Sequence, residues 1–458
     1  MLQVQAWLAN RREAIIAQLL EFARIPSVST DPAHAADVAS AAAYVAAQLR
    51  AAGLADAAVR PTAGHPVVTA AWRGAPGQPT VLVYGHFDVQ PPDPLAAWTS
   101  EPFNPVIRNN RVYGRGVSDD KGPMLIPIKV AEAFFACTGA LPVNMVFLFE
   151  GEEEVSSAHL EAFVAANRDY LAADFVLSAD GAQWRADLPS AITGSRGICA
   201  LEVSVTGAAK DLHSGRHGGA VANPIQVLVG LLAQLHDAGG RVAVPGFYDH
   251  AIELPKAELD LISALDWNEA DYFRSIGAPG GAGEAGYTPL QRNWVRPTLE
   301  FNGISGGYAG PGKKTIIPST ASAKITCRLV PEQEPGATAQ LVATFLQAQA
   351  PAGVSISARV EAGGANPYAV PQDHPRLALA ENVLHDITGI RPIRVRMGAT
   401  IPIGDIFKRV LGIDTIFFSF ATSDEDYHAP NEFFRLDSLD TGLKAWVLFL
   451  ARLADCPR

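Results

Sequence analysis

Apolar and polar positions follow two periods along the chain, one typical of helices and one typical of strands. Over the first 60 residues, apolar side chains recur every three or four positions, which predicts two helices, the second over Pro32–Ala52. Short apolar runs then alternate with helical stretches, and this alternation predicts an open, mostly parallel α/β sheet. The expected strands are Val67–Ala71, Thr80–Tyr84, Val143–Phe149 and Phe175–Ser178, and the expected helix is Met124–Ala136.

The pattern changes near Gly194. From there the chain reads strand, helix, strand, helix, strand, which predicts a compact α+β insertion of the ferredoxin-like kind. Residues Gly239–Pro297 inside the insertion show no clear period and are expected to be irregular, with the glycine-rich stretch Gly277–Gly286 as a loop. The insertion's elements are expected at Cys199–Val205, Pro224–His236, Ala321–Val330, Ala337–Gln349 and Val354–Val360.

Helix and strand alternation returns near Pro367, with elements expected at Leu377–Thr388, Thr415–Ser419 and Ser438–Ala454. The insertion therefore interrupts the α/β domain in this interpretation. We expect residues 1–194 and 365–458 to form the α/β domain and residues 195–364 to form the inserted domain.

Composition narrows the class of protein. The chain has 458 residues, 48% of them hydrophobic and 18% charged, with a formal net charge of −11. Such a chain forms a packed core, and its acidic balance argues against binding to nucleic acid or to a membrane surface. Four widely spaced cysteines and an N-terminus, Met1–Gln5, without signal-peptide features lead us to expect a cytoplasmic protein.

Residues able to bind metal follow the expected strands. His86 and Asp88 come after the strand Thr80–Tyr84 and point the same way, so Asp88 can orient the imidazole of His86. Asp119 precedes a helix, where it either caps that helix or bridges two metal ions. Four acids within Glu150–Glu154 repel one another, so they either form a solvated loop or surround a bound cation. In the second case, one of them can act as a general base.

Two further strands end in the same way. Asp180 follows Phe175–Ser178, and His428 follows Thr415–Ser419. Taken singly, each is an ordinary turn residue; taken together, an imidazole or carboxylate after each of five strands indicates a metal site. Histidine and carboxylate ligands suit zinc, manganese or cobalt, and the lack of cysteine ligands favours a catalytic site over a structural one.

Seven short segments carry a resemblance to a known family. Together they resemble the M20 family of di-metal peptidases, and within it the cytosolic nonspecific dipeptidase and carnosinase group. They occur in the family's order and span most of the chain. The segments are Gly85–Pro91, Gly114–Pro123, Glu150–Glu154, Lys210–Gly215, Gly310–Pro318, Cys327–Pro331 and His428–Glu432.

The resemblance implies a two-metal hydrolase that cleaves the amide bond of dipeptides or short peptides. Each subunit is then expected to bind two divalent ions, zinc first, with manganese or cobalt as alternatives. Glu153 is implied as the general base on a metal-bridging water, and Asp88 as the residue that orients His86. The implied ligands are His86, Asp119 and Asp180 for one ion, and Asp119, Glu154 and His428 for the other.

The insertion resembles the family's lid and dimerisation domain, which implies a homodimer. His213, with Thr315, is expected to enter the active site of the partner subunit and help to bind the substrate. Arg328 and the loop of Gly398, Ala399 and Thr400 are expected to hold the substrate's terminal carboxylate.

One departure from the family pattern leaves the substrate open. Some members carry an acid, able to meet a free amino terminus, where this chain has Met397. An N-acyl amino acid is therefore a competing substrate, cleaved by a deacylase or desuccinylase-like reaction with the same mechanism. A third interpretation, a non-catalytic binding protein, is opposed by the complete ligand set and the intact Glu153.

Overall fold

The computed structural model describes residues 1–456, which form two compact units. Unit 1 comprises Met1–Thr193, Val370–Val395 and the chain from Ile403 onward, and unit 2 comprises Gly194–Ala369 and Arg396–Pro402. The chain passes between the units within β8 (Ser190–Ser195), just after β15 (Tyr368–Ala369) and within β16 (Ile393–Met397).

The expected domain boundaries differ from these units at Gly194, at residues 365–369 and, most of all, at residues 396–402. We expected residues 396–402 to belong to the α/β domain, whereas the structure places Arg396–Pro402 in unit 2. Hydrogen bonds explain the difference: Arg196 donates to the carbonyl oxygens of Met397, Gly398 and Ala399, and Arg328 donates to Thr400.

Unit 1 is built on a six-stranded sheet in the order β1-β2-β6-β3-β7-β17. The last four of these strands are parallel to one another, and β1 and β2 are antiparallel additions at one edge. Strands β3 and β6 are buried along their whole length, as expected for strands covered by helices on both faces. The strands are β1 (Ala58–Arg60), β2 (Val67–Trp72), β3 (Thr80–His86), β6 (Asn144–Glu150), β7 (Phe175–Ser178) and β17 (Thr415–Phe417).

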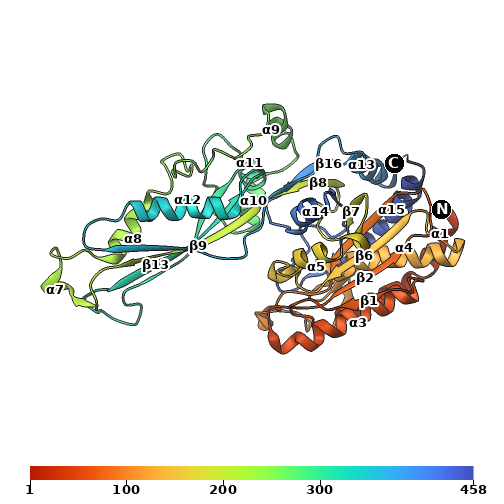
Figure 1. Ribbon diagram of the computed structural model, residues 1–458, viewed down its shortest axis with the longest axis horizontal. Helices are drawn as coiled ribbons and strands as arrows, with labels where there is room; N and C mark the ends of the chain where they lie inside the picture. Colours follow the sequence, from red (N-terminus) through yellow and green to blue (C-terminus); the bar gives the residue numbers. More distant parts are fainter. Residues whose placement is uncertain (457–458) are drawn as a thin grey trace. The chain divides into compact units, whose positions relative to one another are not determined.

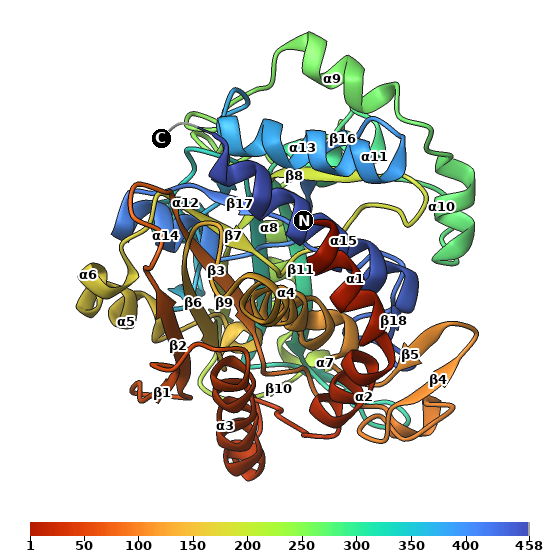
Figure 2. The ribbon, with the colours of Figure 1, turned by 90° about the vertical axis from the view of Figure 1, so that its right-hand side faces the viewer.

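Helices cover both faces of this sheet. Figure 2 shows α5 and α14 on one side and α4 with α15 and α1 on the other, and α4, α15 and α1 pack against one another. Helices α4 and α13 end at glycines with φ of +73° and +71°, a backbone region that favours glycine. The helices are α1 (Leu2–Asn10), α2 (Arg12–Ala23), α3 (Ala35–Ala51), α4 (Gly122–Thr138), α5 (Leu160–Ala166), α6 (Arg168–Leu171), α13 (Pro375–Thr388), α14 (Ile403–Leu411) and α15 (Leu436–Ala454).

Unit 2 contains an antiparallel sheet in the order β11-β13-β9-β14, with helices α8 and α12 packed on it (Figure 1). Buried and partly exposed residues alternate along β9, so one face of the sheet forms the core. This is the ferredoxin-like arrangement predicted from the sequence. The elements are β9 (Gly197–Thr206), α8 (Pro224–Ala233), β11 (Thr298–Gly306), β13 (Thr320–Leu329), α12 (Pro335–Ala348) and β14 (Ser355–Val360).

The expectation of irregular structure over Gly239–Pro297 is wrong in part. This segment contains the short helices α9 (Lys256–Ser263), α10 (Glu269–Ser275) and α11 (Pro289–Val295). Helix α11 begins with a capping box in which Thr288 and Gln291 bind each other's backbone. The edge strand β11 was also not predicted, because most of its residues are exposed and show no alternation.

Smaller elements complete the two units. In unit 1, a second sheet contains β4 (Val106–Arg108), β5 (Arg111–Tyr113) and β18 (Phe433–Arg435). In unit 2, β10 (Leu212–His213) and β12 (Ile316–Ile317) form a two-stranded ribbon. The short helix α7 (Ser214–His217) directly follows β10 in the chain. Among residues 1–456, no helix is both long enough and apolar enough to cross a bilayer.

Candidate metal centre

The metal-ligand candidates of unit 1 lie at one edge of the large sheet. Strands β3, β6, β7 and β17 are parallel, so their carboxyl ends meet at this edge. Each strand is followed by a short segment that carries a candidate ligand. His86 ends β3, Glu153 and Glu154 begin the 3-10 helix η4 (Glu153–Val155) after β6, Asp180 follows β7, and His428 follows β17.

Asp119 joins these side chains into two sets. It lies in the helical turn η3 (Val117–Lys121) before α4. Its Oδ1 is 3.0 Å from Nε2 of His86, and its Oδ2 is 2.9 Å from Nε2 of His428. Nε2 of His428 is also 3.3 Å from Oε2 of Glu154.

Within each set, the potential ligand atoms all lie within 4.8 Å of one another. One set is His86, Asp119 and Asp180, and the other is Asp119, Glu154 and His428. The structure thus brings together all five residues predicted as ligands, with Asp119 common to both sets.

Burial, together with neighbouring negative charge, raises the pKa of three carboxylates in this cluster. Burial and then the charge of Asp119 raise the pKa of Glu154 to about 7, and burial raises the pKa of Asp180 to about 6. Burial also raises the pKa of Glu153 well above its usual range. For Asp119, burial acts in the same direction, but hydrogen bonds from His428 and His86 outweigh it and lower the pKa.

This donor set fits a pair of divalent cations. Carboxylate oxygens and imidazole nitrogens bind zinc and manganese, and Asp119 offers one oxygen to each set. Within residues 1–456, no lysine or arginine forms an ion pair with Asp119, Glu153, Glu154 or Asp180, so a bound cation would offset their mutual repulsion.

Asp88 contacts both His86 and the acidic turn. Nδ1 of His86 lies 3.1 Å from the carbonyl oxygen of Asp88 and 3.5 Å from its Oδ1, which leaves Nε2 directed towards Asp119. The buried carboxylate of Asp88 accepts the backbone N–H groups of Glu153 at 3.2 Å and Glu154 at 3.1 Å. The sequence predicted the contact with His86 but not the two contacts with the acidic turn.

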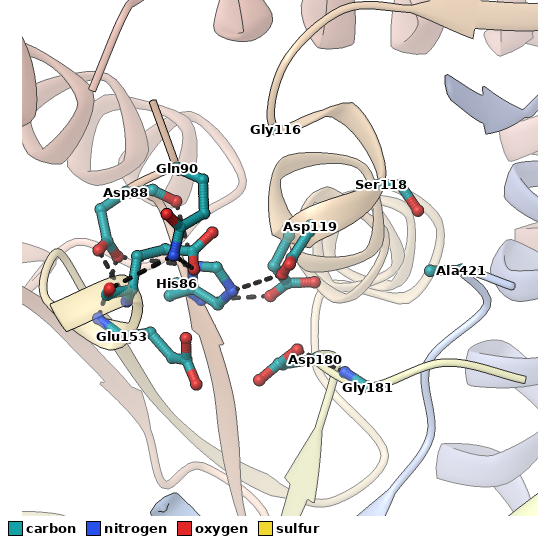
Figure 3. Close-up of polar contacts among 12 residues, drawn as sticks. His86, Asp88, Gln90, Gly116, Ser118, Asp119, Glu153, Asp180, Gly181 and Ala421 are labelled. Carbon is teal, nitrogen blue, oxygen red and sulfur yellow. Dashed lines mark hydrogen bonds and ion pairs between the residues drawn. The ribbon is translucent and has the colours of Figure 1, made fainter. Parts of the chain in front are cut away.

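The Glu153 carboxylate has no hydrogen-bond partner among the described residues. Figure 3 shows its side chain extending towards Asp180. A carboxylate that is close to the ligand sets and not engaged elsewhere is available to accept and return a proton.

Sequence reasoning missed two residues that hold ligands in place. Nε2 of Gln90 donates to Oε2 of Glu154 at 2.7 Å (Figure 3). His86, Asp88 and Gln90 occupy every second position, and this spacing was the available signal. The buried carboxylate of Glu432 accepts the backbone N–H of Asp119 at 3.2 Å, a long-range contact that no local pattern indicates.

The predicted substrate-binding residues lie in unit 2 and form two groups. His213 pairs with Ile316 across the β10–β12 ribbon, and the N–H of Ser214 donates to the carbonyl oxygen of Thr315 at 3.0 Å, so exposed His213 and Thr315 are close neighbours. The second group joins Arg328 to the loop of Gly398, Ala399 and Thr400.

The second group includes an arginine that the sequence did not single out. Nη1 of Arg328 donates to Oγ1 of Thr400 at 2.8 Å, and Nε of Arg196 donates to the carbonyl oxygen of Gly398 at 2.9 Å. Burial lowers the pKa of Arg328, and burial together with the charge of Arg328 lowers the pKa of Arg196 to about 10. Arg328 forms no ion pair among the described residues.

The sheet of unit 1 carries two ligand sets and an unengaged glutamate at its carboxyl edge. This arrangement is the framework of a metal-dependent hydrolase. The sequence profile of peptidase family M20/M25/M40 matches residues 82–452. The chain belongs to this family, as its motifs predicted, and is therefore a peptidase.

Similar proteins agree with this assignment. The chain is 29% identical over 463 residues to the Cys-Gly metallodipeptidase dug1 of Schizosaccharomyces pombe, covering 97% of this chain and 96% of the relative. It is 31% identical over 394 residues to the human Beta-Ala-His dipeptidase, covering 85% and 78%. Its fold matches the M20 family metallo-carboxypeptidase Sso-CP2 of Sulfolobus solfataricus with a TM-score of 0.85 and 30% identity, covering 96% and 99%.

Proposed function

We propose that the protein is a two-metal hydrolase that cleaves the amide bond of dipeptides or short peptides. One observation carries the proposal: Asp119 belongs to both ligand sets, and the unengaged carboxylate of Glu153 lies beside them. The dipeptidase names of the relatives from S. pombe and human support this substrate class.

In this proposal, His86, Asp119 and Asp180 hold one cation, and Asp119, Glu154 and His428 hold the other. When bound, the cations supply Lewis-acid chemistry: they lower the pKa of water and stabilise negative charge on the substrate's carbonyl oxygen. We take zinc as the first choice of metal and manganese or cobalt as alternatives, because oxygen and imidazole ligands accept all three.

The chain's own residues then manage the proton. Glu153 takes a proton from the attacking water at a carboxylate oxygen and returns it to the nitrogen of the leaving amine. The backbone contacts of Asp88 with Glu153 and Glu154 hold this acidic turn against His86 during both transfers.

Residues of unit 2 are proposed to bind the substrate. Arg328, whose guanidinium also holds Thr400, binds the terminal carboxylate with two N–H donors, and the loop of Gly398, Ala399 and Thr400 lies beside it. His213 and Thr315 are exposed on their ribbon and are assigned to the active site of a partner subunit.

A homodimer through unit 2 is part of the proposal. Strand β11 lies at an edge of its sheet and exposes Phe301 and Ile304, and exposed edges of this kind pair with other chains. Further exposed apolar side chains lie on or near α8 and β11. They are Val221, Val229 and Tyr308.

We also propose a cytoplasmic location without nucleic-acid or membrane partners. Cys137, Cys199, Cys327 and Cys456 are all free thiols, which suits a reducing compartment, and the net charge of −11 disfavours polyanionic partners.

Met397 supports a second substrate class, the N-acyl amino acids. An apolar side chain at this position offers no carboxylate to a free amino terminus, and N-acyl amino acids lack the positive charge of that terminus.

A panel of dipeptides with matched N-acetyl and N-succinyl amino acids tests which substrate class is preferred, through kcat/KM. Faster hydrolysis of the dipeptides supports the proposal, whereas faster hydrolysis of the acylated compounds replaces it with a deacylase. Full activity in metal-free protein would contradict both.

A further inference from the structure

A buried glutamate of the C-terminal loop binds the segment that carries Asp119. Glu432 precedes β18, and its side chain is 0% exposed. Its Oε2 accepts Nη1 of Arg115 at 2.7 Å and the N–H of Gly116 at 2.8 Å. Its Oε1 accepts the N–H groups of Ser118 at 2.9 Å and Asp119 at 3.2 Å.

These four donors require a carboxylate. Three backbone N–H groups converge on the two oxygens of one carboxylate, which is a geometry that binds anions, and the guanidinium of Arg115 adds a charge-assisted bond. Gly116 makes the convergence possible because its φ of +78° lies in the left-handed region, and a Cβ there would lie 2.2 Å from Val89.

The loop held by Glu432 also carries His428. Asp426, His428 and Asn431 have φ values of +53°, +64° and +66°, which residues other than glycine seldom adopt. The side chain of His428 is 52% exposed, so packing does not fix it. Hydrogen bonds near the ends of the loop hold this conformation, among them those of Asn431 with the carbonyl oxygen of Ala97 and the N–H of Thr99.

Both ends of the loop are bonded to the segment that carries Asp119. At one end is Glu432. At the other end, Oε2 of the buried Glu425 accepts the hydroxyl of Ser118 at 2.6 Å. His428 and Asp119, 309 positions apart in the sequence, are thus tied together by two glutamates.

We propose that Glu432 is a positioning residue of the metal centre, which fixes Asp119 relative to His428 for the cation held by Asp119, Glu154 and His428. This inference rests on the proposed function, because it requires that set to bind a cation. The other set depends on Glu432 less, because His86 and Asp180 follow strands of the central sheet and only Asp119 lies on the bonded segment.

Titration of metal-free protein with Co²⁺, followed by calorimetry and visible absorption, tests the inference. In Glu432→Gln, the amide NH2 faces two of the four donors, so the carboxylate cradle is lost while the side-chain shape is kept. We expect one of two binding steps to weaken roughly 10- to 100-fold. It should be the step that His428→Ala removes, and the other step should remain near the wild-type value.

Two further variants make the test decisive. Ser118→Ala removes only the bond to Glu425 and should weaken the same step by less. Glu284→Gln is the matched control, because it alters a buried carboxylate bonded to Arg296 in unit 2 and should leave both steps unchanged. Thermal unfolding of each metal-free variant checks that it is folded.

The outcomes separate this inference from the proposed function. Wild-type protein that binds fewer than two ions contradicts the proposed metal centre itself. Two ions in the wild type, with both steps unchanged or equally weakened in Glu432→Gln, overturn the positioning role alone. If Glu432→Gln does not fold, Glu432→Asp takes its place, because it keeps the charge but withdraws the carboxylate from its four donors; two unchanged binding steps in that variant overturn the positioning role.

Discussion

The candidate metal centre of unit 1 and the proposed substrate-binding groups of unit 2 are built in opposite ways. In unit 1, five segments converge at the edge of a buried sheet, and hydrogen bonds from Asp88, Gln90 and Glu432 hold the ligands. In unit 2, His213 and Thr315 lie exposed on a two-stranded ribbon. The buried, hydrogen-bonded residues of unit 1 can hold their geometry unaided, whereas in our proposal the exposed residues of unit 2 need a substrate or a second chain to complete their site.

The largest effect should come from Asp119, which belongs to both ligand sets. Asp119→Ala removes the shared ligand, so we expect hydrolysis to fall to background and bound metal to fall from two ions towards none. Metal analysis and dipeptide assays measure this. Asp187→Ala alters an exposed carboxylate of unit 1 bonded to Arg185 and should change neither. Retained activity in Asp119→Ala would remove the basis for a shared centre.

Substitution of Glu153 should slow hydrolysis without loss of bound metal. In Glu153→Gln we expect kcat to fall roughly 10²- to 10⁴-fold with two ions still bound, because a general base is lost and no ligand is. Glu152→Gln is the control within the same acidic turn, since Glu152 binds His65 and His159 instead of the ligand sets. A similar loss in both variants would assign the effect to the turn rather than to proton transfer.

His213 tests whether unit 2 completes the site of a partner. His213→Ala should lower kcat roughly 10²-fold, in the range for lost oxyanion donors, without loss of metal. Mixed dimers of His213→Ala and Glu153→Gln subunits should regain activity, because one of their two sites then has both residues intact. Mixed dimers no more active than the two parents would mean that His213 acts within its own chain or not at all.

Substitution of Arg328 should weaken substrate binding more than it slows the hydrolysis step. Arg328→Met removes a charged donor pair, so we expect kcat/KM for dipeptides to fall roughly 10- to 100-fold, mainly through KM. Dipeptide amides lack the terminal carboxylate, and for them the same variant should change kcat/KM little. An equal loss for both substrates would show that Arg328 supports the fold of unit 2 through Thr400 instead of gripping the substrate.

The smallest effect on the metal centre should come from the edge of unit 2. Ile304 is 60% exposed on β11, and Ile304→Glu should convert a dimer to a monomer with both metal ions retained. Sedimentation analysis measures this change. Ile107→Glu places the same charge at a 46% exposed position of unit 1 and should leave the assembly unchanged. A wild-type monomer, or an Ile304→Glu dimer, would contradict assembly through β11.

Sequence reasoning predicted the α/β fold and selected candidate ligands that lie together in the structure, because both depend on local signals. Strands such as Thr80–His86 are continuous apolar runs, and a ligand directly after such a strand lies at the edge where parallel strands end. The family motifs then supplied the assignment of Asp119 to both sets.

What the sequence did not predict depends on contacts between distant segments. Glu432 binds Asp119 from 313 positions away, and Arg196 holds Gly398 across 202 positions. The latter contact is also why residues 396–402 fall in unit 2 against expectation. Edge strand β11 was missed for another physical reason, because a mostly exposed strand shows no buried face.

Anomalous diffraction from crystals grown with Zn²⁺ or Co²⁺ would locate the cations themselves. We expect two anomalous peaks per chain, about 3.5–4 Å apart, with the carboxylate of Asp119 between them. One peak should contact His86 and Asp180, and the other Glu154 and His428. A single peak, or two peaks that do not share Asp119, would contradict the account.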